Sequence, residues 1–198
     1  MRIGVLAIQG DVREHMRHIQ RAGAESSLVR VVRDLEDVQG LIIPGGESTT
    51  IGMLMDEYGL IDALRERTQR GPFPIYGTCA GLILLATTVI GKSPARLGLV
   101  DIDASRNAFG RQLASFEVDL DIPVLGRAPF PAVFIRAPQI QRLGRTVTPL
   151  AWYRGQAVMA EAGPYLVSAF HPEMSDDVRI HQYFVEKVRR SLTVKGVS

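Results

Sequence analysis

Short apolar runs alternate with segments of helical periodicity through the first half of this chain, and few folds are compatible with that order. The runs have the length of strands and occupy residues 3–8, 28–32, 40–43 and 74–76. Helical spacing of apolar residues follows at Val12, Met16 and Ile19, and again within residues 49–57 and 60–70. This alternation predicts an α/β fold in which a mostly parallel sheet carries helices on both faces.

The second half has a different pattern. From about Leu97 onward the apolar residues alternate with polar ones in short segments, as at Phe116 and Val118, which indicates half-exposed antiparallel strands added to the sheet. Residues 165–170 are a further strand-like run, and the chain returns to a helix after Asp176 and Asp177. The sheet is therefore expected to be mixed, within one domain that spans residues 1–198.

The composition excludes several classes of protein. A formal net charge of +2, with basic residues scattered among acidic ones, gives no surface for nucleic acid. A single cysteine cannot form an intrachain disulfide, and no segment has the length of a signal peptide core or a membrane span. A cytoplasmic protein is expected.

The one cysteine lies in a distinctive setting, Gly77-Thr78-Cys79-Ala80-Gly81. A strand precedes it and an apolar helix over residues 82–88 is expected to follow, which is the pattern of a nucleophile elbow. The glycines permit a sharp turn, and the N-terminus of a helix favours a thiolate. A buried structural cysteine is the alternative for an isolated cysteine, but the glycine pair favours the nucleophile.

A thiolate nucleophile requires a base, and the best candidate is in Phe170-His171-Pro172-Glu173, just after the strand-like run 165–170. Residues two apart in an extended segment point the same way, so Glu173 can orient one ring nitrogen of His171 while the other faces the cysteine. The remaining histidines lie among charged residues on expected helices, and we interpret them as solvated: His15, His18 and His181. No cluster with metal-ligand spacing is recognisable, so no metal is expected.

The loop at residues 44–50 joins the third strand to a helix. Ser48 or Thr49 is expected to cap that helix. The Gly45-Gly46 pair can also present backbone N–H groups to a developing oxyanion, and both roles are compatible. A phosphate-binding loop is disfavoured because no Gly-Lys-Ser/Thr follows.

Two segments contain arginines within distinctive sequence motifs, which are Arg106-Asn107-Ala108-Phe109-Gly110-Arg111 and Phe134-Ile135-Arg136-Ala137-Pro138. Most arginines are surface charges, and nothing in the residues alone assigns these two arginines a different role.

Taken together, these motifs resemble the class I, triad-type glutamine amidotransferases. The similarity is strongest to the glutaminase subunits of pyridoxal 5'-phosphate synthase, because the two arginine segments match that vitamin B6 branch. The resemblance implies a Cys79 nucleophile, a His171 acid/base and a Glu173 that orients it. It also implies glutamine contacts, which are Gly46, Glu47, Ser48, Arg106, Ile135 and Arg136.

The resemblance further implies a partner, a (β/α)8-barrel synthase subunit that uses the ammonia to make pyridoxal 5'-phosphate. The chain itself would need no cofactor. We further hypothesise that Gly10, Gly46 and Ala80 supply an oxyanion hole, and that docking of the synthase fixes the Gln9-Gly10 turn.

Three alternatives stay open on the sequence. A glutaminase subunit serving histidine or nucleotide synthesis would share the triad but lack the two arginine motifs. A cysteine hydrolase or peptidase would cleave esters or peptides. A binding subunit with a decayed site would have a broken triad.

Overall fold

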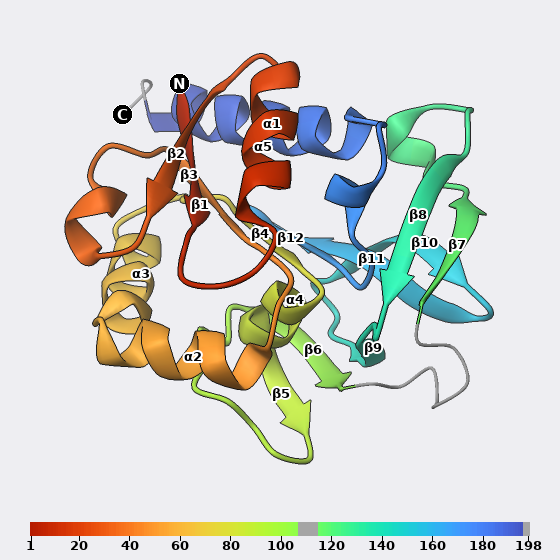
Figure 1. The fold of residues 1–198 in the computed structure, drawn as a ribbon, viewed down its shortest axis with the longest axis horizontal. Helices are drawn as coiled ribbons and strands as arrows, with labels where there is room; N and C mark the ends of the chain where they lie inside the picture. Colours follow the sequence, from red (N-terminus) through yellow and green to blue (C-terminus); the bar gives the residue numbers. More distant parts are fainter. Residues whose placement is uncertain (107–114, 196–198) are drawn as a thin grey trace.

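A seven-stranded sheet forms the centre of the computed structural model, which describes residues 1–106 and 115–195 (Figure 1). Its strands are β1 (Arg2–Leu6), β2 (Glu25–Val29), β3 (Gly40–Ile43), β4 (Ile75–Thr78), β10 (Thr148–Tyr153), β11 (Gln156–Ala162) and β12 (Tyr165–Ser168). They lie in the order β10-β11-β12-β4-β3-β1-β2. Every pair from β12 to β2 is parallel, whereas β11 is antiparallel to both its neighbours. The prediction of a mixed, mostly parallel sheet is confirmed.

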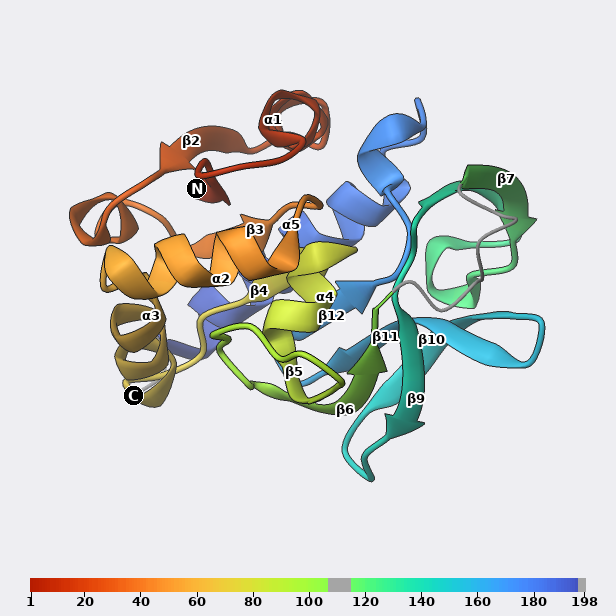
Figure 2. The same cartoon turned by 60° about the horizontal axis from the view of Figure 1, so that its bottom comes forward.

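The helices lie in two groups, one on each face of the sheet (Figures 1 and 2). α1 (Val12–Arg21) contacts α5 (Arg179–Lys195), and α2 (Ser48–Glu57) contacts both α3 (Leu60–Gln69) and α4 (Ala80–Leu85). Because they are covered on both sides, the central strands β3 and β4 are buried along their whole length.

Two smaller sheets depart from the expectation that later strands extend the main sheet. β5 (Ala86–Ile90), β6 (Val100–Ser105) and β9 (Gln139–Leu143) form one of them, and β7 (Ser115–Leu120) pairs with β8 (Phe130–Ile135) in the other. The expected helix over residues 82–88 ends at Leu85. The β-branched residues from Thr87 to Ile90 instead pair with β6, because strand pairing suits such side chains better than a helix does.

The boundaries of the first two strands also differ from the prediction. β1 ends at Leu6, so Ile8 and Gln9 belong to the following loop. β2 begins at Glu25 because its register with β1 pairs Arg2 with Glu25. The residues from Val32 to Leu35 form the 3-10 helix η1.

The ends of the parallel strands bring four loops together. The loop after β1 carries Gln9 to Asp11, the loop after β3 carries Gly45 to Glu47, Cys79 follows β4, and His171 follows β12. Open α/β sheets bind their ligands at this carboxyl edge. Within the described ranges, no helix is both long and apolar enough to cross a membrane.

Candidate active site

Cys79 is the single residue between the last residue of β4 and the first of α4. Its φ of 47° and ψ of −100° lie in a region that non-glycine residues rarely adopt. The turn requires glycine on both sides. A Cβ on Gly77 would lie 2.5 Å from the Gly81 backbone, and a Cβ on Gly81 would lie 2.2 Å from the Ile43 carbonyl oxygen. The predicted elbow is therefore built by backbone sterics.

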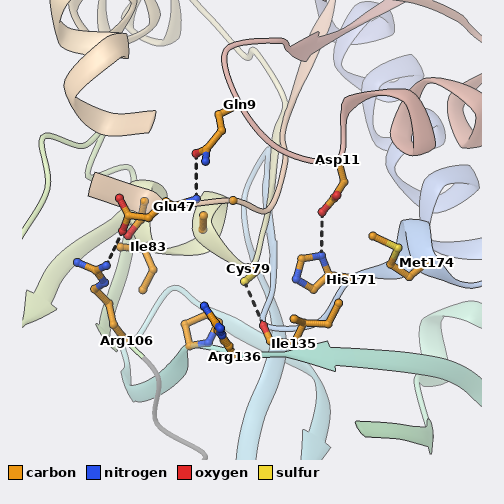
Figure 3. Close-up of a pocket in the computed structure, with 14 residues that line it drawn as sticks. Gln9, Asp11, Glu47, Cys79, Ile83, Arg106, Ile135, Arg136, His171 and Met174 are labelled. Atoms are coloured by element: carbon orange, nitrogen blue, oxygen red, sulfur yellow. Dashed lines mark hydrogen bonds and ion pairs between the residues drawn. The ribbon is translucent and has the colours of Figure 1, made fainter. Parts of the chain in front are cut away.

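The Cys79 side chain opens onto a cavity of about 480 Å³ (Figure 3). The six residues predicted to contact glutamine all line this cavity, as do His171 and Ala80. The thiol donates to the carbonyl oxygen of Ile135 at 3.9 Å. Gln9, from the predicted Gln9-Gly10 turn, also lines the cavity, whereas Gly10 itself is not among the lining residues. Four further lining residues were not predicted from the sequence: Asp11, Ile83, Pro138 and Met174.

His171 lies beside Cys79 and is held through its Nδ1 atom. Nδ1 is 2.8 Å from Glu173 Oε1, and both side chains are buried. The same nitrogen is 3.4 Å from Asp11 Oδ2, a second carboxylate that the sequence interpretation missed (Figure 3). Because carboxylates occupy Nδ1, the ring offers its Nε2 atom for chemistry.

The charge of His171 follows from these neighbours. Burial by itself lowers its pKa, but hydrogen bonds with Asp11, Cys79 and Glu173 outweigh burial and raise the pKa of His171 to about 12. The hydrogen bond to His171 in turn lowers the pKa of Asp11. At neutral pH the ring is therefore an imidazolium, the cation that stabilises a neighbouring cysteine thiolate.

The loop after β3 packs directly against this histidine. A Cβ on Gly45 would lie 2.4 Å from His171 Cε1, so a larger residue would displace the ring. The backbone N–H of Glu47 donates to Gln9 Oε1 at 3.0 Å, which joins the loops after β3 and β1.

The cap of α2 differs from the prediction. Glu47 is the N-cap residue, and its side chain accepts from the backbone N–H of Thr50 at 2.8 Å. Ser48 and Thr49 are instead the first two helical residues, because the Glu47 carboxylate reaches the Thr50 N–H from one position earlier. Burial raises the pKa of Glu47, but its hydrogen bonds to Thr50 and Thr49 have the larger combined effect and lower it.

The two arginine motifs converge on the same cavity from different strands. Arg106, directly after β6, forms an ion pair with Glu47 and donates to Thr49 Oγ1 at 2.9 Å. Arg136 follows β8 and has a φ of 44°, so its backbone is strained at the edge of the cavity. The rest of the first motif, residues 107–111, lies outside the described residues.

The interpretation of the other histidines as solvated is wrong. His15 and His181 have no exposed surface and His18 is 6% exposed. They lie where α1 packs against α5, whereas the charged residues that surround them in the sequence occupy other faces of these helices. Adjacent residues on a helix point in different directions, so the charged neighbours in the sequence do not indicate whether these histidines are exposed.

Asp11, His171 and Glu173 form a group whose ligand atoms lie within 4.8 Å of one another, close enough to hold a metal ion. Both carboxylates face the same ring nitrogen, at hydrogen-bonding or ion-pair distances. The shared contact with the His171 Nδ1–H therefore explains why the two carboxylates lie so close together.

Solved structures define the class of protein to which this fold and site belong. A crystal structure of a glutamine amidotransferase matches with a TM-score of 0.90 and 47% identity, covering 94% of this chain and 98% of that one. The structure of PurLQS from Thermotoga maritima has the same fold with a TM-score of 0.64 and 18% identity, covering 98% of each chain. The fold is that of the class I glutamine amidotransferases.

The family can then be stated more narrowly. The family model described as the SNO glutamine amidotransferase family matches residues 5–190, and the chain belongs to this family. A relative from Pelotomaculum thermopropionicum, named pyridoxal 5'-phosphate synthase subunit PdxT, is 54% identical over 197 residues, which cover 99% of this chain and all of the relative. A protein of the same name from Moorella thermoacetica is 50% identical over 188 residues, 95% of this chain and all of that protein.

Proposed function

We propose that this chain is the glutaminase subunit of a pyridoxal 5'-phosphate synthase. It hydrolyses L-glutamine to L-glutamate and ammonia, and it passes the ammonia to a synthase subunit for vitamin B6 synthesis. The observation that carries the proposal is the strained Cys79 elbow opening onto a cavity where His171 is held by Glu173. Family membership and full-length similarity to proteins named for this complex support the same function.

The reaction uses the three side chains in sequence. The Cys79 thiolate attacks the side-chain carbonyl carbon of glutamine, and the carbonyl oxygen becomes an oxyanion. The tetrahedral intermediate collapses as the C–N bond breaks, and His171 donates its proton to the departing ammonia. A water molecule then gives a proton to His171 and attacks the thioester, which releases glutamate and restores the thiolate. Glu173 keeps the ring oriented throughout, from the Nδ1 side.

The cavity offers recognition for both ends of a free amino acid. Arginines suit the α-carboxylate because a guanidinium can bind it in a forked geometry, and Arg106 and Arg136 both line the cavity. The α-ammonium needs acceptors, which the Glu47 carboxylate and the Ile135 carbonyl supply. Gly46 and Ser48 complete the glutamine site, and the whole chain, residues 1–198, acts as one cytoplasmic domain that needs no cofactor.

Backbone N–H groups of Gly10, Gly46 and Ala80 form the oxyanion hole in this proposal. Gly10 has a φ of 109°, and a Cβ there would lie 1.8 Å from the Gly45 carbonyl oxygen, so it packs against the loop that carries Gly46. The partner, a (β/α)8-barrel synthase subunit, fixes this turn when it docks. Because one oxyanion donor contributes roughly 100- to 1000-fold to kcat, the isolated chain is slow and the docked chain is fast.

Ammonia and glutamate release from glutamine, with and without the synthase subunit, tests the proposal. Equal amounts of both products are expected, with a large gain on adding the synthase, and asparagine serves as the control substrate. Gly10→Val is expected to reduce the gain while an electrophilic glutamine analogue still modifies Cys79. Absence of glutamine hydrolysis in the complex would refute the function, and full activity without the synthase would refute the activation.

A further inference from the structure

A buried polar cluster lies behind the active site, on the side of Glu173 away from His171. Glu173 Oε1 is bonded to His171, but Oε2 is fully buried and has no aligned hydrogen bond among the described residues. A buried carboxylate oxygen without a donor is costly. His15 Nε2 lies 3.4 Å from this oxygen, within ion-pair distance of it. The two side chains have no exposed surface.

The hydrogen bonds of this cluster have a defined direction. A carboxylate oxygen can only accept, so His15 must carry its proton on Nε2 if it is to serve Glu173. His15 Nδ1 is then an acceptor, and His181 Nε2 lies 2.9 Å from it. His181 therefore donates through Nε2, and its Nδ1, which has no partner in the described structure, carries a lone pair in place of an N–H.

Both histidines are suited to this neutral arrangement. Burial lowers the pKa of His15, and burial lowers the pKa of His181 well below its usual value. The groups that face them are His18, Tyr76, Thr78 and Glu173, together with Asp11 and His171 at greater range. Tyr76 bonds to Ser168 and does not compete for the histidine protons.

The Nε2–H of His15 has two acceptors within reach. Thr78 Oγ1 lies 3.3 Å away with aligned geometry, and Glu173 Oε2 lies 3.4 Å away. A hydrogen bond to an ionised acceptor is about twice as strong as one to a neutral hydroxyl, so a shared N–H is drawn toward the carboxylate.

We propose that His15 is a positioning residue for the proposed catalytic Glu173, to which it donates its Nε2–H, and that His181 fixes the tautomer that allows this. The proposal rests on the proposed function of Glu173 and extends it. The support runs from α5 through α1 to the triad: His181 orients His15, His15 restrains Glu173, and Glu173 orients His171. His15 touches no substrate and acts only through the carboxylate.

The test compares two substitutions of His15 in the complex with the synthase subunit. His15→Leu removes the donor, whereas His15→Gln places an amide N–H about where Nε2 lies. His15→Leu should lower kcat by about ten- to a hundredfold, the range for a lost hydrogen bond to a charged group, with little change in KM. His15→Gln should restore most of kcat. The alkaline limb of the pH profile should move to lower pH in His15→Leu, because a loosened Glu173 holds the His171 proton less well.

A double-mutant cycle with Glu173→Gln separates positioning from structural support. The readout is the rate at which an electrophilic glutamine analogue modifies Cys79, measured by mass spectrometry. His15→Leu should slow this rate in the wild-type background and change it less than about twofold when Glu173 is already Gln. The matched control is Tyr76→Phe, which also removes a buried hydrogen bond near His181 but should leave kcat and the pH profile unchanged.

The outcomes are distinct. Equal losses in both backgrounds, or a loss in His15→Gln as large as in His15→Leu, would overturn the positioning role. If His15→Leu does not fold, His181→Leu replaces it. The same losses in kcat and in the rate of Cys79 modification are then expected, but they should be smaller. Retained activity in Glu173→Gln itself would instead refute the proposed triad.

Discussion

The two halves of the candidate active site are held by different forces. On the cysteine side, the β4–α4 turn requires Gly77 and Gly81, because a Cβ at either position would collide with backbone atoms. On the histidine side, the His171 ring is oriented because its Nδ1–H donates to the carboxylates of Glu173 and Asp11. Backbone collisions cannot be relaxed by a rotamer change, whereas hydrogen bonds can lengthen or exchange partners. We therefore expect all-or-none responses on the cysteine side and graded responses on the histidine side.

The largest effect is expected for Cys79→Ala, which removes the proposed nucleophile. Loss of a nucleophile in such a triad costs on the order of 10⁶-fold in kcat, so glutamine hydrolysis should fall below detection. Alanine keeps the same Cβ, so the fold and the binding of the synthase should persist, which circular dichroism and a pull-down can check. Substantial remaining glutaminase activity would remove Cys79 from the mechanism.

Gly81→Ala probes the cysteine side without touching the thiol. Its methyl group would lie 2.2 Å from the Ile43 carbonyl oxygen, so α4 must move away from β3. We expect a loss of about 1–3 kcal/mol in the free energy of unfolding and a loss of most activity. Denaturant titration and ammonia release measure the two effects.

The control is Gly91→Ala, at a glycine with a φ of 91° where an added Cβ would meet nothing within 4 Å. It should cost about 1–2 kcal/mol for the left-handed backbone alone and leave kcat intact. An active Gly81→Ala enzyme would contradict the all-or-none response.

Arg106→Ala and Arg136→Ala should raise KM for glutamine. A charged hydrogen bond to a carboxylate contributes about 1.5–3 kcal/mol, which corresponds to roughly ten- to a hundredfold. Arg154→Ala is a matched control, since Arg154 also has a positive φ but does not line the cavity. Unchanged steady-state kinetics in both single variants would exclude these arginines from substrate binding.

Asp11→Asn should give the smallest effect, less than about tenfold in kcat, because Glu173 still holds Nδ1 and Asp11 is partly solvated. Loss of this carboxylate lowers the pKa of His171, so the alkaline limb of the kcat/KM profile should move to lower pH.

Stability offers a second measurement of the same change. The pKa of His171, about 12, is above its unfolded value of about 6.5, so its proton stabilises the fold fully below pH 6.5. That contribution is lost as pH rises toward 12. The melting temperature of Asp11→Asn should therefore stop falling at a lower pH than that of the wild type, because its His171 gives up the proton at a lower pH. Parallel curves for the two proteins would show that Asp11 does not hold this proton.

The sequence by itself determined the α/β class, the elbow at Cys79 and the pairing of His171 with Glu173. The first two depend on local information: strand-length apolar runs, and glycines that bracket one residue. The pairing depends on a separation of two residues, although Glu173 lies in the 3-10 helix η3 (Pro172–Met174) and not in the extended segment that was expected. Spacing along the chain is sufficient for each of them.

Only the tertiary structure decided which distant groups meet around that core. Asp11 reaches His171 because the loop after β1 ends beside the one after β12, and His15 meets His181 because α1 packs against α5. The charged neighbours of these histidines predicted solvent exposure, and the packing of two helices buried them instead. Contacts between residues far apart in the sequence depend on how whole elements dock, and docking is set by the shape and burial of complete faces, which the pattern around any single residue does not encode.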